Sequence, residues 1–75
     1  MAERLANRLL ELRGGQGLTQ AALAELVGVS RKTVNTVENG IFIPSTVLAL
    51  KLARALGEPV EAIFTLVDDS LPGSN

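Results

Sequence analysis

Two helix-start signals, eleven residues apart, constrain this chain more than any other feature. Within residues 19–40, TQAALAELVGVSRKTVNTVENG, Thr19 and Ser30 are of the residue types that cap helix N-termini. Each follows an apolar residue that has another apolar residue five positions later, which is the spacing of a hydrophobic staple. Between them stands Gly28, which lacks a Cβ and can therefore take the left-handed conformation that ends a helix. The stretch predicts two short helices joined by a tight turn.

The apolar residues of this stretch recur at helical spacing and indicate which sides pack together. They are Leu23, Leu26, Val27, Val29, Val34 and Val37. Ala24 is expected to face the turn, where a small side chain lets the second helix cross closely over the first. The outer face of the second helix is polar, and it carries no acidic residue before Glu38.

Further signals accompany this pair of helices over residues 7–64. They are LTQ at 18–20, Ala24, GVS at 28–30, ENG at 38–40, Pro44-Ser45 and LARALG at 52–57. In these features the chain resembles the lambda-repressor-like (Cro-type, xenobiotic-response-element) helix-turn-helix transcriptional regulators. The resemblance implies an all-α, compact five-helix domain with its helix-turn-helix at 19–39. It also implies a regulator that binds a palindromic operator in double-stranded DNA as a homodimer.

The resemblance places the second helix, residues 30–39, in the major groove of DNA. Base contacts are then expected from Arg31, Lys32, Thr36 and Thr33, and phosphate contacts from Gln20, Thr19, Ser30, Asn35 and Asn39. Arg31 is suited to bidentate recognition of guanine, and Thr36 can offer its methyl group to thymine or its hydroxyl to a base. Asn35 is equally credible as a base contact from the flank. The alternative for each residue is an ordinary solvated helix surface.

Arg13 and Glu38 correspond to a basic and an acidic residue that are usually paired in this family. The resemblance therefore implies a structural ion pair that fixes the first helix against the second helix of the motif. The alternative is that both side chains are solvated and contribute about 0 to 1 kcal/mol. Neither residue is expected to contact DNA.

Helix signals also predict the elements on either side. Leucines at i, i+4 and i+7 predict a first helix over residues 2–13, which the glycine-rich residues 14–17 end. Ser45 caps a fourth helix that stops at Gly57, and a short fifth helix follows Pro59. The domain is expected to cover residues 1–67, with residues 68–75 as a flexible acidic tail.

Two apolar segments do not fit a solvated surface. Ile-Phe-Ile at 41–43 departs from the family, which often has basic or polar residues there. It forms either a lid on the core or an exposed patch that another subunit covers, with Phe42 the main contact. Residues 64–67 are β-prone in an otherwise helical chain, so we expect this segment to pair with its copy in a second protomer through Phe64 and Leu66. The alternative is a frayed extension.

Composition limits the remaining possibilities. The chain has 75 residues, enough for one small domain, and neither cysteine nor histidine, which excludes disulfides and the commonest zinc sites. No metal or cofactor is expected. No apolar run approaches the roughly 20 residues of a membrane span, and the N-terminus lacks a signal peptide's apolar centre, so the expected location is the cytoplasm.

The charge is polarised along the chain. Residues 1–57 hold all seven basic residues and four acids, whereas residues 58–75 hold four acids and no base. Only the basic part would need to face DNA. An alternative function is an antitoxin-like or adaptor protein that acts mainly through protein contacts. An enzyme is not expected, because the only adjacent carboxylates, Asp68 and Asp69, have no nucleophile, base or cofactor loop beside them.

Overall fold

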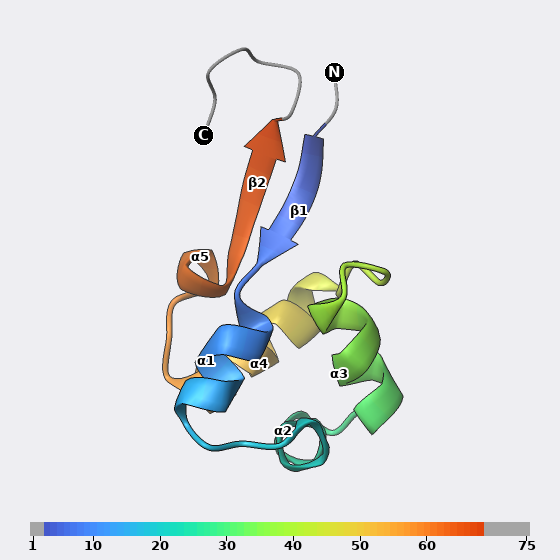
Figure 1. Cartoon of the computed structure of the whole chain (residues 1–75), viewed down its shortest axis with the longest axis vertical. Helices are drawn as coiled ribbons and strands as arrows, with labels where there is room; N and C mark the ends of the chain where they lie inside the picture. Colours follow the sequence, from blue (N-terminus) through green and yellow to red (C-terminus); the bar gives the residue numbers. More distant parts are fainter. Residues whose placement is uncertain (1–2, 69–75) are drawn as a thin grey trace.

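The computed structural model of the chain describes residues 3–68 and shows a small helical body with a two-stranded ribbon projecting from it (Figure 1). The elements in chain order are β1 (Glu3–Asn7), α1 (Leu9–Gly15), α2 (Gln20–Val27), α3 (Arg31–Glu38), α4 (Thr46–Leu56), α5 (Val60–Ile63) and β2 (Phe64–Asp68). The prediction of a mostly helical domain with five helices is confirmed. Of the acidic tail expected at 68–75, Asp68 is the last residue of β2, and the rest lies outside the described residues.

Local capping explains where the three longest helices begin. The side-chain hydroxyl of Thr19 accepts a hydrogen bond from the Ala22 amide at 3.0 Å, at the start of α2. Ser30 and Ser45 cap α3 and α4 in the same way, each accepting from an amide three residues later at 3.1 Å. Such a cap satisfies one of the amides that have no partner inside the helix. These starts are therefore encoded by single residues.

Twelve apolar side chains from all five helices and the start of β2 form one core. They are Leu9, Leu23, Ala24, Val27, Val34, Val37, Leu48, Leu52, Ala53, Leu56, Ile63 and Phe64. The prediction that Leu26 joins this core is wrong, because its side chain is 61% exposed. The buried stripe of α2 centres on Leu23, Ala24 and Val27, and Leu26 lies roughly a third of a turn from that centre.

The N-terminal segment corrects the expectation of a helix over residues 2–13. Residues 3–7 are the strand β1, which pairs antiparallel with β2 from Glu3↔Asp68 to Asn7↔Phe64. Helix α1 begins only at Leu9. Leucine spacing fits a helix, but the backbone of this segment obtains its hydrogen bonds from a strand some sixty residues away in the chain.

The same ladder shows that the β-prone C-terminal segment has a partner strand in its own chain, contrary to expectation. Asn7 joins the ribbon to the helical body. Its side-chain amide donates to the Val37 carbonyl at 3.0 Å, and its side-chain oxygen accepts from the Leu9 amide at 3.0 Å. The Arg8 amide donates to the Ile63 carbonyl at 2.8 Å. The backbone of β2 therefore does not require a second protomer.

Candidate nucleic-acid interface

The turn between α2 and α3 holds the two helices in a fixed crossing. Gly28 has φ +74°, in the left-handed region, and the amide of Val29 donates to the Ala24 carbonyl at 3.0 Å. Ala24 is buried at 3% exposure, as its predicted place beneath the turn requires. Because the turn ends α2 abruptly and Ser30 immediately caps α3, the second helix starts at the surface of the body (Figure 1).

Helix α3 is amphipathic, with one face in the core and the other open to solvent. Val34 and Val37 are buried at 1% and 2% exposure. On the opposite side, Arg31, Lys32 and Asn35 are exposed and line a shallow hollow of about 280 Å³. The structure therefore gathers three of the expected DNA-contacting side chains on one surface.

The two threonines of α3 lie at the edge of this outward face and are half-buried. The Thr36 hydroxyl donates to the Thr33 carbonyl at 3.0 Å, which directs that hydroxyl at its own helix. The Thr33 hydroxyl lies 2.9 Å from the Ser30 hydroxyl. Both hydroxyls thus have partners within the helix, and the Thr36 methyl group is the part best suited to contact a base.

Three of the expected phosphate contacts lie at helix ends and already have partners in the chain. The hydroxyls of Thr19 and Ser30 accept the capping hydrogen bonds of α2 and α3. At the other end of α3, the side-chain amide of Asn39 donates to the Asn35 carbonyl at 2.9 Å and lies 3.3 Å from the Asn35 side-chain oxygen. Both asparagines are exposed, so these contacts are made at the surface.

Gln20 is the first residue of α2, as predicted, but it makes a contact that the sequence did not indicate. It is half-buried, and its side-chain amide donates to the Glu38 carboxylate at 2.9 Å. The same carboxylate accepts from Nε of Arg13 at 2.6 Å and from Nη2 at 3.3 Å, so the ion pair implied by the resemblance is present. A third Arg13 nitrogen donates to the Leu18 carbonyl at 2.7 Å.

These contacts form a network that joins α1, the start of α2 and the end of α3. The side chains of Arg13 and Glu38 are 12% and 4% exposed, so the pair is largely withdrawn from water. Glu38 is the only acidic residue of α3, and the network neutralises its charge. The network therefore fixes the position of α3 and removes a negative charge from the helix.

The described residues offer little for other chemistry. No group of three or more His, Cys, Asp or Glu side chains within residues 3–68 is arranged to hold a metal ion. Over the same residues, no helix has both the length and the apolar character needed to cross a bilayer.

A short helix packed beneath a second helix, with a glycine turn and an outward polar face, defines a helix-turn-helix DNA-binding domain. The chain belongs to the helix-turn-helix family of lambda-repressor-like type, and the match to that family covers residues 9–63. The family consists of transcriptional regulators, which are not enzymes, and membership supports DNA binding and regulation.

Individual relatives agree with this assignment. The chain is 39% identical over 66 residues to the HTH-type transcriptional regulator YgzD of Bacillus subtilis, covering 88% of this chain and all of the relative. It is 54% identical over 54 residues to an HTH-type transcriptional regulator of Methanothermobacter thermautotrophicus, covering 71% and 78% of the two chains. Among solved structures, the restriction-modification controller protein C.AhdI of Aeromonas hydrophila superposes with a TM-score of 0.71 at 45% identity. The superposition covers 73% of this chain and 83% of C.AhdI.

Proposed function

We propose that the chain is a sequence-specific regulator that reads double-stranded DNA with α3 in the major groove. The observation that supports this most directly is the outward face of α3. Arg31, Lys32 and Asn35 are exposed there, while the one carboxylate of the helix is held by Arg13. A polyanion can approach this face without meeting an unpaired negative charge on the helix.

In this arrangement the first turn of α3 reads the bases. Arg31 donates two hydrogen bonds to the major-groove edge of guanine, and Lys32 contacts an adjacent base. Thr36 presents its methyl group to thymine, because its hydroxyl is directed at the Thr33 carbonyl. Thr33 contributes from the edge of the face.

Phosphate contacts on both sides of the groove set the orientation of α3. Asn35, on the outward face of α3, and Asn39, at the end of the helix, bind phosphate. The hydroxyls of Thr19 and Ser30 accept the capping hydrogen bonds and donate their own protons to phosphate. The side-chain amide of Gln20 has two N–H groups. One keeps its hydrogen bond to Glu38, and the other donates to a phosphate. Binding at Gln20 is thereby linked to the network that positions α3.

Selection of bound sequences from a random duplex library tests this function, followed by titration of the selected site against a scrambled one. We expect one enriched motif with two-fold symmetry and affinity that falls as salt rises. Enrichment of no motif, with equal affinity for both duplexes, would contradict sequence-specific recognition.

The protein acts as a homodimer in this proposal, because one α3 contacts too few base pairs to select a site in a genome. A symmetric pair would place two α3 helices about 34 to 36 Å apart on a palindromic operator.

The dimer surface expected from the sequence needs revision, however. Phe64 is 8% exposed and belongs to the core, so it offers little surface to a partner and cannot be the main contact. Phe42 is half-exposed and lines a groove beside α3.

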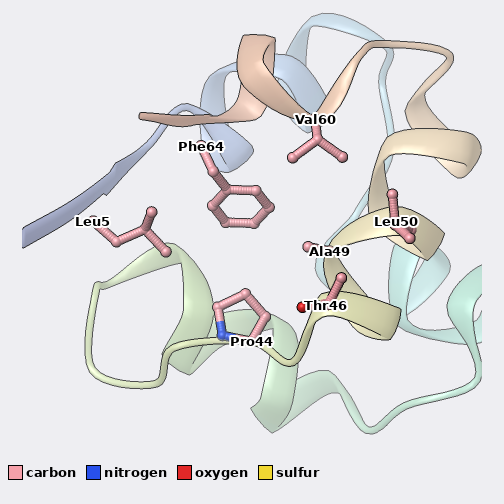
Figure 2. A pocket seen from close by; sticks show the side chains of 7 residues that line it. All are labelled: Leu5, Pro44, Thr46, Ala49, Leu50, Val60 and Phe64. Carbon is pink, nitrogen blue, oxygen red and sulfur yellow. The ribbon is translucent and has the colours of Figure 1, made fainter. Parts of the chain in front are cut away.

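The apolar surface best placed for dimerisation lies between the ribbon and the helical body. Figure 2 shows a hollow of about 230 Å³, with Leu5 of β1 on one side, Leu50 of α4 on the other, and Phe64 facing Pro44 across it. Leu50 and Leu66 are 56% and 65% exposed. We place the interface on Leu66, Leu50 and the hollow.

Residues 41–43 are exposed, so the lid on the core expected as one possibility is absent.

Leu66→Asp should weaken the dimer at least about tenfold, because an unpaired carboxylate would be buried in an apolar contact. Sedimentation over a range of protein concentrations measures this. Leu26→Asp is the control: Leu26 is similarly exposed at 61%, but it lies on α2, at the end of the body opposite the ribbon (Figure 1). Equal weakening by both variants, or a wild-type monomer that co-purifies with an unrelated protein, would contradict this interface.

A further inference from the structure

The basic side chains without a carboxylate partner gather on two neighbouring helices. Of the seven Lys and Arg residues, Arg8 pairs with Glu11, Arg13 pairs with Glu38, and Arg4 has interactions of its own. Within residues 3–68, those without an ion pair are Arg31 and Lys32 of α3 and Lys51 and Arg54 of α4. Helix α4 itself contains no acidic residue. The positive charge of the surface therefore extends beyond α3.

Lys51 lies in a groove shared by the two helices. The groove has a volume of about 310 Å³ and runs between the first turn of α3 and the first half of α4. Its lining residues are Val29, Thr33, Phe42, Ser45, Val47, Leu48 and Lys51. No acidic side chain is among them. Lys51 thus lines the same groove as Thr33, which lies at the edge of the surface that faces DNA in the proposed function.

The loop between α3 and α4 leaves this side of α3 without another cation. Residues 40–45, GIFIPS, carry no charge, and Ile41 and Ile43 are 75% and 71% exposed. Large aliphatic side chains cannot bind phosphate. Apart from the cations of α3 itself, a DNA strand that passes on this side would therefore meet the unpaired cations of α4.

We propose that Lys51 is a DNA-binding residue that contacts a backbone phosphate beside the groove occupied by α3. The apolar groove packs the methylene stem of the lysine while the ammonium group reaches the phosphate. The contact orients the domain and raises affinity for every sequence, since phosphates carry no base information. This inference rests on the proposed binding of DNA through α3.

Arg54 provides a matched comparison on the same helix. It is exposed and has no ion pair within the described residues. It lines a different groove with Val47, Leu50 and Lys51, and all four lining residues of that groove belong to α4. Removing either charge changes the net charge equally, but only Lys51 is placed to touch the DNA strand.

The test measures affinity for the selected duplex as a function of salt concentration for wild type, Lys51→Gln, Lys51→Arg and Arg54→Gln. We expect Lys51→Gln to reduce the slope of log affinity against log salt by about one per protomer, with unchanged base preference. Lys51→Arg should keep the slope, and Arg54→Gln should leave it near the wild-type value. Urea unfolding checks that each variant folds.

Two results would overturn the inference while leaving the proposed function intact. One is a wild-type slope in Lys51→Gln, and the other is an equal reduction in Arg54→Gln, which would show a general effect of net charge. Wild-type protein that selects no DNA sequence and binds without salt dependence would remove the proposed function and this inference together.

Discussion

Glu38→Gln is expected to lower the free energy of unfolding by about 3 to 5 kcal/mol, a large part of the roughly 5 to 15 kcal/mol typical of a small domain. The substitution keeps the shape of the side chain but removes its charge. Arg13, whose side chain is only 12% exposed, would then hold an uncompensated positive charge away from water. The midpoint of urea unfolding should fall without a change in the slope of the transition.

Glu11→Gln is the matched control for this change. Glu11 is also an acid paired with an arginine, and its Arg8 partner lies at 2.9 Å. The guanidinium of Arg8 lowers the pKa of the Glu11 carboxyl, first by hydrogen bonding and then by its charge. Both side chains are more than half exposed, at 53% and 67%, so water screens the pair. The unfolding midpoint should move little.

Replacing both members of the buried pair separates the cost of a stranded charge from the net value of the pair. Arg13→Met combined with Glu38→Leu removes both charges and leaves an apolar contact of similar volume. We expect this double variant to recover much of the stability lost in Glu38→Gln. If the double variant were no more stable than Glu38→Gln, a stranded charge would not explain the lost stability. Equal losses of stability in Glu38→Gln and Glu11→Gln would contradict the explanation as well.

The network also matters for DNA binding, because it holds the end of α3. Gln20 and Arg13 approach Glu38 from two other helical segments, so Glu38→Gln leaves one acceptor oxygen where two served both donors. A domain that remains folded should then bind DNA more weakly, although Glu38 itself is not a proposed contact. In that case the loss should be similar for all sequences, since the side chains that read bases are unchanged.

Features encoded within a few residues were predictable from the sequence. Thr19, Ser30 and Ser45 cap helices in the structure, and Gly28 and Gly57 end them in the left-handed conformation. Each of these signals acts through backbone groups two to four residues away. Helix starts and stops could therefore be inferred without knowing the rest of the fold.

The ribbon could not be predicted in the same way. The leucines at 5, 9 and 12 match a helical period, yet Leu5 pairs with Leu66 in a ladder that joins the two ends of the chain. A strand is stabilised by its partner, and nothing near residue 5 in the sequence identifies that partner. The expectation that residues 64–67 have no partner strand in their own chain was wrong for the same reason, because their partner, β1, had the leucine spacing of a helix.

The candidate site was only partly predictable. The outward face of α3 follows from periodicity, since Val34 and Val37 must point into the core and Arg31, Lys32 and Asn35 then point away. The hydrogen bond from Gln20 to Glu38 depends on how α2 and α3 cross, and the place of Lys51 beside Thr33 depends on where α4 packs. Such proximities between separate helices have no signature in local sequence.

Arg31→Ala should abolish preference at one base pair in each half of the operator and weaken specific binding by about 1 to 3 kcal/mol per protomer. The two contacts in a symmetric complex lie about 34 Å apart, so their losses should add to about 2 to 6 kcal/mol for the dimer. Arg31 is exposed and unpaired within the described residues, so the fold should be unaffected. Binding titrations against the selected operator and its single-base variants measure both effects.

Arg31→Lys distinguishes base recognition from simple attraction to DNA. Lysine keeps the positive charge but lacks the planar pair of donors that matches the two acceptors of guanine. If Arg31 reads a base, this variant should keep most of the non-specific affinity and lose the preference at that position. If Arg31 binds only phosphate, lysine should restore affinity for every sequence equally and the operator preference should survive even in Arg31→Ala. That second pattern would place the first turn of α3 against the DNA backbone and outside the base-reading groove.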